Sequence, residues 1–137
     1  MVTKLVGTWR LKSSENFDEY LGAVGVGFMW RKLAATAKPD VIIEEKDGEW
    51  IITTKATFKT TVLKFKLGEE FGEVRGDGKE LQTTVEDVDG KLVQTQKAAG
   101  VNGEDSVITR ELNEDGIMLT TMAVGSVVCK REYTKAT

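Results

Sequence analysis

Turn signals recur along the chain after its single proline, Pro39, and they constrain the fold more than any other feature of the sequence. The signals are Asp47-Gly48, Gly76-Asp77-Gly78, Asp89-Gly90, Asn102-Gly103, Asp115-Gly116 and Gly125-Ser126. Most of them are separated by about 10 to 14 residues, the spacing of short strands joined by tight hairpins. The sequence therefore predicts an antiparallel meander from residue 47 to the C-terminal end.

The segments between these turns are rich in Val, Ile and Thr, which strands prefer. They read VIIEEK, EWIITTKA, TFKTTVLKFKL, ELQTTVEDV, KLVQTQK, DSVITREL, IMLTTMAV and VVCKREY. With LVGTWRLKSS at the start and the short FGEVR at 71–75, about ten strands are expected. No repeat with a period of ~20 to 50 residues indicates a propeller or solenoid, and a closed barrel leaves few exposed edges. We expect a mainly β fold, a ten-stranded antiparallel up-and-down β-barrel.

Helical periodicity occurs only between about residues 16 and 37. One apolar face is formed by Phe17, Tyr20, Leu21 and Val24, and a second short helix carries Val26, Met29, Trp30 and Leu33. Asn16 and Glu19 have the spacing of a capping box, and the second helix should end before Pro39. Two short amphipathic helices inserted after the first strand predict a helix-turn-helix lid on the barrel.

Length and composition predict one soluble domain spanning residues 1–137. The chain is 40% hydrophobic and 30% charged, and its apolar runs fall short of the ~20 residues that span a bilayer. The N-terminal MVTKLVGTW lacks the features of a secretory signal, and the lone Cys129 fits a reducing compartment, so we expect a cytoplasmic protein. The net charge of −3, with both signs interspersed, argues against a nucleic-acid partner.

Histidine is absent from the sequence, and cysteine occurs once. Catalysis by serine or cysteine through a histidine base is therefore excluded, as is a zinc cluster built from the usual ligands. The strand faces offer no close carboxylate pair for acid–base work. We expect no enzymatic activity, no metal and no cofactor.

The final strand places a cation and a phenol on one face. Alternation groups Val127, Cys129, Arg131 and Tyr133 against Val128, Lys130 and Glu132. A strand arginine is usually a solvated outer residue, but the more charged opposite face of this strand favours Arg131 inside the barrel. Arg110 lies two strands earlier, so the two arginines could meet across the strand between them if both face inward. Two buried guanidiniums and a phenol would require an anion, such as an organic carboxylate with an apolar tail.

Nearly the whole chain resembles the intracellular lipid-binding proteins, and among them the heart, adipocyte and myelin type of fatty-acid-binding protein. The resemblance rests on VGTWRLKSSENFDEYLGAVGVGF, KP at 38–39, TFK at 57–59, FKLGEEF at 65–71, DGK at 77–79, KLVQTQK at 91–97, TREL at 109–112 and VVCKREY. It implies a flattened ten-stranded barrel (a clam) under a helical lid, with one fatty acid inside. It also implies that Arg131 and Tyr133 hold the carboxylate, with Arg110 as the partner arginine.

The same resemblance implies roles for residues along the cavity and its portal. These residues are Phe17, Val26, Pro39, Phe58, Asp77 and Met122. Plain alternatives stay open: helix packing for Phe17 and Val26, a core role for Phe58, and a turn role for Asp77. The basic residues Arg31, Lys32, Lys38 and Lys59 match a region that can touch anionic membranes, although such charges are commonly only solvated.

The resemblance thus predicts a monomeric carrier that binds a long-chain fatty acid without a covalent bond and transports it inside the cell. A retinoic acid carrier is the alternative within the class, because the same arginines and tyrosine suit that acid. A membrane-surface structural protein of the same fold is the alternative outside it. Two departures from the family pattern are the longer turn AAGVNGEDS after Lys97 and the large Trp30 in the lid.

Overall fold

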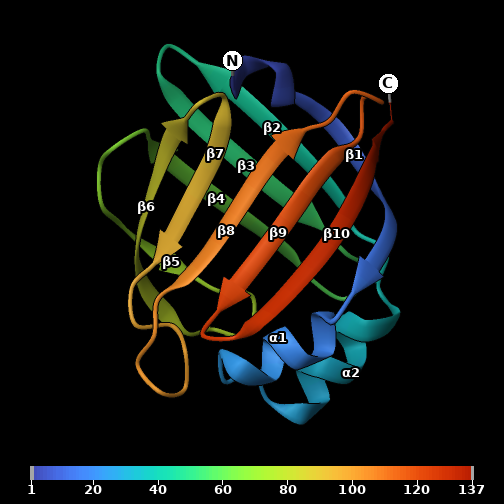
Figure 1. Cartoon of the computed structure of the whole chain (residues 1–137), viewed down its shortest axis with the longest axis vertical. Coiled ribbons are helices and arrows are strands. Elements are labelled where there is room, and N and C mark those ends of the chain that lie inside the picture. The colour runs from blue at the N-terminus through green and yellow to red at the C-terminus, as the bar shows by residue number, and fades with distance from the viewer. Residues whose placement is uncertain (1, 137) are drawn as a thin grey trace.

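The computed structural model describes residues 2–136, and ten strands form one antiparallel sheet in the order β4-β3-β2-β1-β10-β9-β8-β7-β6-β5. The strands are β1 Gly7–Glu15, β2 Asp40–Lys46, β3 Glu49–Lys55, β4 Thr60–Lys66, β5 Phe71–Val74, β6 Glu80–Val88, β7 Lys91–Gln96, β8 Ser106–Leu112, β9 Met118–Val124 and β10 Val127–Lys135. Pairing of the first and last strands curls the sheet into a nearly closed barrel, with β4 and β5 at its ends (Figure 1). The predicted mainly β, ten-stranded up-and-down barrel with a helical lid is confirmed.

In two of the predicted hairpin turns, the backbone angles explain why an Asp-Gly pair predicts a turn. Asp47 and Gly48 have φ angles of 54° and 87°, and Asp89 and Gly90 have 53° and 84°. Two consecutive residues with positive φ match the right-handed twist of the flanking strands, and Asp followed by Gly tolerates this conformation best. These turns fix the registers of β2 with β3 and of β6 with β7.

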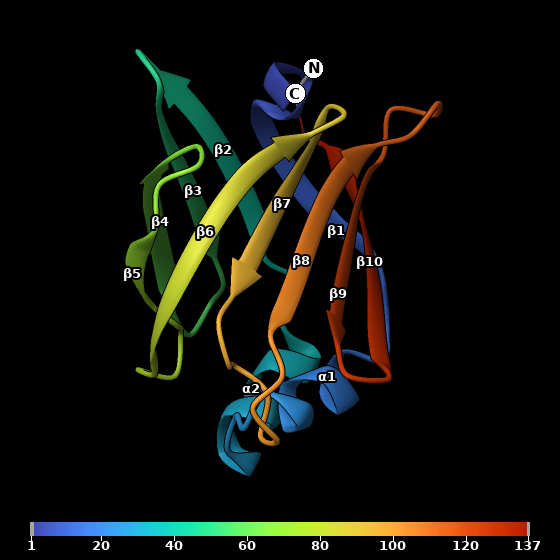
Figure 2. The ribbon, with the colours of Figure 1, turned by 60° about the vertical axis from the view of Figure 1, so that its left-hand side comes forward.

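Helices α1 (Phe17–Ala23) and α2 (Phe28–Thr36) lie together at one end of the barrel, within the predicted range of 16–37 (Figures 1 and 2). The capping-box interpretation of Asn16 is wrong, because Asn16 has a left-handed backbone (φ 61°) and its side chain makes no cap hydrogen bond. Its Nδ2 donates instead to the carbonyl of Val128, 3.2 Å away, which ties the start of the lid to β10. Within residues 2–136, no helix has the length and apolar character needed to cross a membrane.

A short 3-10 helix, η1 (Val2–Leu5), precedes β1 and lies at the end of the barrel opposite the lid. The sequence patterns did not predict it. Leu5 is buried, and its carbonyl accepts a 2.8 Å hydrogen bond from the indole nitrogen of Trp9. Trp9 is itself buried in the barrel, so this bond joins η1 to the apolar packing that fills this end.

The buried apolar residues form two clusters rather than one. The first surrounds Trp9, Trp50 and Phe65 at the η1 end, and the second joins Tyr20 and Val24 of the lid region to barrel residues such as Cys129. Because each end of the barrel has its own packed cluster, the middle of the barrel does not need to be filled by side chains. That arrangement leaves room for an internal cavity.

Candidate ligand-binding site

A cavity of about 270 Å³ lies inside the barrel and reaches the lid. Its volume is near the lower end of the range for small-molecule pockets, roughly 300 to 1,000 Å³. Every site residue named from the sequence lines it: Arg110, Arg131, Tyr133, Phe17, Val26, Pro39, Phe58, Asp77 and Met122. The two helices and most of the strands contribute to its wall, so the cavity is a product of the whole fold.

The two arginines lie on either side of one residue of the strand between them. Thr120 of β9 pairs with Arg110 of β8 on one side and with Arg131 of β10 on the other. Residues directly opposite each other in antiparallel strands share a face of the sheet, with Cβ atoms about 5 Å apart. All three residues line the cavity, so both guanidiniums lie in one row on the inner wall.

Arg131 is 6% exposed, and a lid residue covers it. Its guanidinium carbon lies 3.8 Å from the centre of the Phe17 ring, where the negative face of the ring attracts the cation. Its Nε donates to the hydroxyl of Ser14 at 3.2 Å. No ion pair among residues 2–136 involves Arg131, so its charge is met by a ring and a hydroxyl and not by a carboxylate.

Arg110 and Tyr133 complete the polar part of the wall. Nη1 of Arg110 donates to Oε1 of Gln94 at 2.8 Å. Burial lowers the pKa of the Arg110 guanidinium, and the neighbouring Tyr133 and Glu73 oppose that shift. Burial raises the pKa of the Tyr133 phenol, against the opposing effect of Arg131 and Arg110. Tyr133 therefore stays protonated at neutral pH and can donate a hydrogen bond.

Thr120 belongs to this site, although sequence reasoning did not select it. Its side chain is 4% exposed, and its hydroxyl has no hydrogen-bond partner among residues 2–136. An unpartnered buried hydroxyl costs free energy, so such a group at a cavity wall is a candidate contact for a ligand. The available sequence signal was its position on the strand between those of Arg110 and Arg131.

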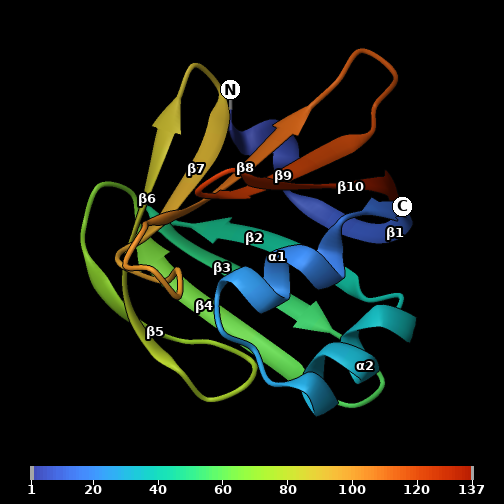
Figure 3. The same cartoon turned by 60° about the horizontal axis from the view of Figure 1, so that its bottom comes forward.

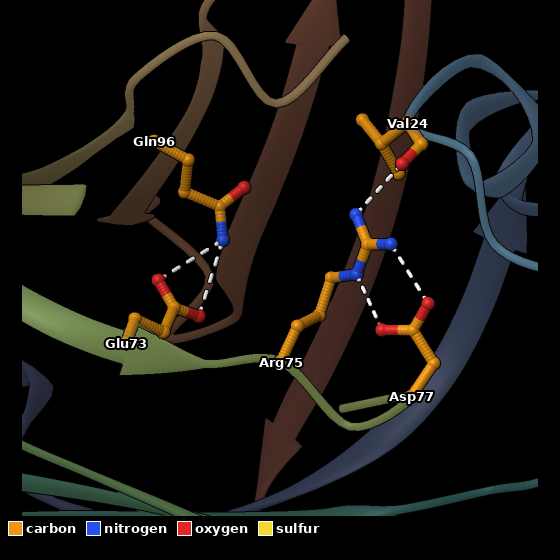
Figure 4. A network of polar contacts seen from close by, with 5 residues as sticks. All are labelled: Val24, Glu73, Arg75, Asp77 and Gln96. Atoms are coloured by element: carbon orange, nitrogen blue, oxygen red, sulfur yellow. Dashed lines mark hydrogen bonds and ion pairs between the residues drawn. The ribbon is translucent and has the colours of Figure 1, made fainter. Parts of the chain in front are cut away.

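Glu73 of β5 is a second residue that sequence reasoning did not select. It is 9% exposed, and three neutral side chains donate to its carboxylate. Thr83 Oγ1 and Gln94 Nε2 donate to Oε1 at 2.8 and 3.0 Å. Gln96 Nε2 lies 3.1 Å from both oxygens, as Figure 4 shows. A buried carboxylate is tolerated when it is hydrogen-bonded in this way.

An ion pair near the cavity connects the barrel to the end of α1 (Figure 4). Arg75 donates to both oxygens of Asp77 at 2.6 and 2.8 Å and, through Nη1, to the carbonyl of Val24 at 2.8 Å. The hydrogen bond from Arg75 is the main cause that holds the pKa of Asp77 below its ordinary value. Asp77 is thus part of a lid contact as well as a turn. The longer loop after Lys97 adds a second contact, from the Val101 N–H to the Ala23 carbonyl at 2.9 Å.

Helix α2 is less buried than α1: Tyr20 of α1 is buried, whereas α2 has no buried residue. Figure 3 shows both helices lying across the end of the barrel. Trp30 of α2 meets Phe58 of the β3–β4 turn edge to face, with ring centres 5.3 Å apart. The outer surface of α2 exposes three large apolar side chains, Phe28, Met29 and Leu33.

The four basic residues near this opening differ in their surroundings. Lys32, Lys38 and Lys59 are exposed, whereas Arg31 is paired with Asp18 at 3.1 Å. Residues 2–136 contain no cluster of three or more Asp, Glu or Cys side chains that could hold a metal ion. The polar side chains of the cavity wall are those of Arg, Lys, Glu, Asp, Thr, Tyr and Gln, around an apolar space.

Comparison with known proteins identifies close relatives of the chain. The model of the lipocalin / cytosolic fatty-acid binding protein family matches residues 6–136. Fatty acid-binding protein 5 of Bos taurus is 46% identical over 134 residues, covering 98% of this chain and 96% of its own length.

Two solved structures of fatty-acid proteins are also similar to this chain over nearly its whole length. The REP1-NXSQ fatty acid transporter has a TM-score of 0.92 and 41% identity, with 98% of each chain covered. A Schistosoma mansoni fatty acid binding protein in complex with arachidonic acid has a TM-score of 0.90 and 34% identity, with 99% of this chain and 98% of that chain covered.

Proposed function

The chain belongs to the lipocalin / cytosolic fatty-acid binding protein family, a non-enzymatic family of lipid-binding and transport proteins, and from that premise we propose which lipid it carries. We propose that the protein binds one long-chain fatty acid without a covalent bond and carries it through the cytoplasm as a monomer. The carboxylate lies against Arg110, Arg131 and Tyr133, and the tail extends towards the lid.

One observation carries this proposal: two arginines flank Thr120 on the inner wall without a carboxylate partner in an ion pair among residues 2–136. Two like charges in one enclosed space repel each other and lose hydration, and an anion between them relieves both costs. A planar carboxylate fits the forked donors of a guanidinium, and the Tyr133 hydroxyl supplies a further donor.

The two halves of such a ligand contribute differently. Each charge-assisted hydrogen bond contributes roughly 1.5 to 3 kcal/mol, and each buried methylene about 0.8 kcal/mol. For a tail of about 16 carbons, the apolar term exceeds the head-group term before the cost of association is subtracted. The tail therefore sets most of the affinity, whereas the arginines set the orientation and the choice of head group.

Displacement of a fluorescent fatty acid by oleate tests this proposal. We expect Arg131→Ala to weaken oleate binding about tenfold or more, because it removes a charged hydrogen-bond donor. Tyr133→Phe should weaken binding less, because it removes a neutral donor. Lys130→Ala is the matched control, because Lys130 is on the same strand, is exposed and alternates to the outer face. If Arg131→Ala and Tyr133→Phe bind oleate as tightly as the parent, the carboxylate assignment is wrong.

Competition between oleate and retinoic acid in the same assay separates the two acid ligands. If retinoic acid displaces the probe more strongly than oleate does, the preferred ligand is a retinoid and not a fatty acid. Native mass spectrometry of the freshly purified protein, followed by lipid extraction, identifies the cargo and gives the oligomeric state.

The outer surface of α2 favours a second activity, transient contact with anionic membranes. Phe28, Met29 and Leu33 are 60%, 72% and 47% exposed, and Lys32 lies beside the Phe28 ring, 5.0 Å from its centre. Exposed apolar side chains next to lysines are the pattern of a helix that rests on a charged bilayer. Lys38 and Lys59 add charge near the same opening, whereas Arg31 is engaged by Asp18 and contributes less.

Sedimentation with anionic vesicles tests this contact. We expect weak binding at low salt that falls as salt rises, and that falls further in Met29→Ser with Lys32→Ala. Strong binding that salt does not weaken would favour a membrane-surface structural role instead. Equal sedimentation of the parent and the double variant would exclude α2 as the contact surface.

A further inference from the structure

The charges along the cavity do not cancel. Arg75 and Asp77 form an ion pair near the lid, and Lys59 is exposed. The remaining charged residues of the wall, among residues 2–136, are Arg110, Arg131 and Glu73. Two cations and one anion leave the interior with one net positive charge. The amount of negative charge that a ligand can bring is therefore set by Glu73 as much as by the arginines.

Glu73 is surrounded inside the barrel by neutral hydrogen-bond donors. Its two oxygens accept all four hydrogen bonds that it makes, from one hydroxyl and two amide groups. An ionised carboxylate accepts bonds of this kind, so the surrounding donors favour its charged form. No ion pair among residues 2–136 contains Glu73, so none of the described cations neutralises it at short range.

A single amide connects Glu73 to the head-group site. Gln94 accepts from Arg110 through Oε1 at 2.8 Å and donates to Glu73 through Nε2 at 3.0 Å. Burial lowers the pKa of the Arg110 guanidinium, and the Glu73 carboxylate, after Tyr133, opposes that lowering. Glu73 and Arg110 thus line the same cavity and are joined through Gln94, so the field of Glu73 reaches an anion held by Arg110.

We infer that Glu73 makes the cavity selective for lipids whose head group carries a single negative charge. This inference rests on the proposed fatty-acid function and states which anions the site accepts. A monoanion between Arg110 and Arg131 brings the interior to neutrality, because Glu73 balances the other arginine. A dianion would leave one uncompensated negative charge in an enclosed space and would be repelled by Glu73. Without Glu73, two arginines and a dianion would balance.

Two detergents separate head-group charge from shape. Hexadecyl sulfate and hexadecyl phosphate have the same tail and a tetrahedral head, but the sulfate carries one charge, whereas a phosphate monoester has a second pKa of about 6 and carries two at pH 8. Both are titrated below their micelle concentration against a bound fluorescent fatty acid. The ratio of the two dissociation constants reports selectivity for charge and is unaffected by a general loss of tail binding.

We expect the parent to bind the sulfate more tightly than the phosphate at pH 8. In Glu73→Gln the ratio should move about twentyfold towards the phosphate, for a charge on the order of 8 to 10 Å from the head group at an effective dielectric constant near 20. Glu86→Gln is the control. It removes the same formal charge from the exposed side of β6, where water screens it, and should leave the ratio unchanged.

The parent alone supplies an independent test that does not depend on the folding of a variant. Between pH 8 and pH 5 the phosphate loses its second charge while the sulfate keeps one, so the preference of the parent for sulfate should narrow about twentyfold. An equal affinity of the parent for both detergents at pH 8, or a Glu73→Gln variant whose ratio does not move, would overturn the inference and leave the carrier function standing. If neither hexadecanoate nor hexadecyl sulfate displaces the probe, the carrier function fails, and the inference fails with it.

Discussion

Thr120→Val removes one hydroxyl from the wall of the cavity while keeping the branched shape of the side chain. The hydroxyl is buried, lies in the row between Arg110 and Arg131, and has no hydrogen-bond partner among residues 2–136. In the proposed complex, this hydroxyl donates to the fatty-acid carboxylate. The substitution should therefore affect the stability of the free protein and the affinity for the ligand in opposite directions.

The two magnitudes follow from the surroundings of Thr120. A buried hydroxyl without a partner costs roughly 1 to 3 kcal/mol, and partial hydration within a polar cavity brings the cost to the lower end, so the free energy of unfolding should rise by about 1 kcal/mol. A hydrogen bond to a charged group contributes roughly 1.5 to 3 kcal/mol, so fatty-acid affinity should fall about tenfold or more.

Urea unfolding of the ligand-free protein and displacement of a fluorescent fatty acid measure the two effects on the same preparations. Thr121→Val is the control, because Thr121 is the next residue of β9 and alternates to the opposite face of the sheet. A Thr120→Val variant that loses stability and keeps its affinity would refute the reasoning, since the hydroxyl would then have a structural partner and no role towards the ligand.

Three further predictions concern the lid contact and the buried thiol. Arg75→Ala should lower the free energy of unfolding by about 1 to 3 kcal/mol, because Asp77 loses its cation, and should speed amide exchange at the end of α1 near Val24. Because Arg75 lowers the pKa of Asp77, the contribution of the pair is complete above about pH 4 and is lost as pH falls through the folded-state pKa, so acid should destabilise the parent more than Asp77→Asn in urea titrations. Cys129 is fully buried with a pKa raised to about 11, so a thiol reagent at pH 8 should label it only after urea unfolds the protein; rapid labelling of the native protein would contradict this.

Local patterns in the sequence determined most of the fold. Asp47-Gly48 and Asp89-Gly90 could be recognised because their backbone requirement is carried by the two residues themselves. The inward direction of Arg131 followed from alternation once Lys130 and Glu132 made the other face the more charged one. Strand alternation then needed only the register of one strand, β9, to bring Arg110 and Arg131 into the same row.

The residues whose roles were not predicted from the sequence owe those roles to contacts between distant segments. Glu73 lies in a strand of four residues, and its donors come from β6 and β7, so nothing in FGEVR indicates a buried carboxylate. Threonine is common in strands, so nothing in the sequence distinguishes Thr120. Its buried hydroxyl without a partner becomes notable only because Arg110 and Arg131 lie opposite it on the neighbouring strands. Asn16 shows the same limit, because a bond to Val128 of β10, 112 residues away in sequence, took the place of the expected local cap.

Carbon-13 NMR of carboxyl-labelled hexadecanoate bound to the protein tests the central claim most directly. A carboxylate held by Arg110, Arg131 and Tyr133 should stay ionised well below the pH of about 4 to 5 at which an exposed carboxyl titrates, so its shift should not change between pH 8 and pH 5. In Arg131→Ala the same signal should begin to titrate at higher pH. A carboxyl signal that titrates in the parent as in free solution would place the head group at the portal and contradict the account.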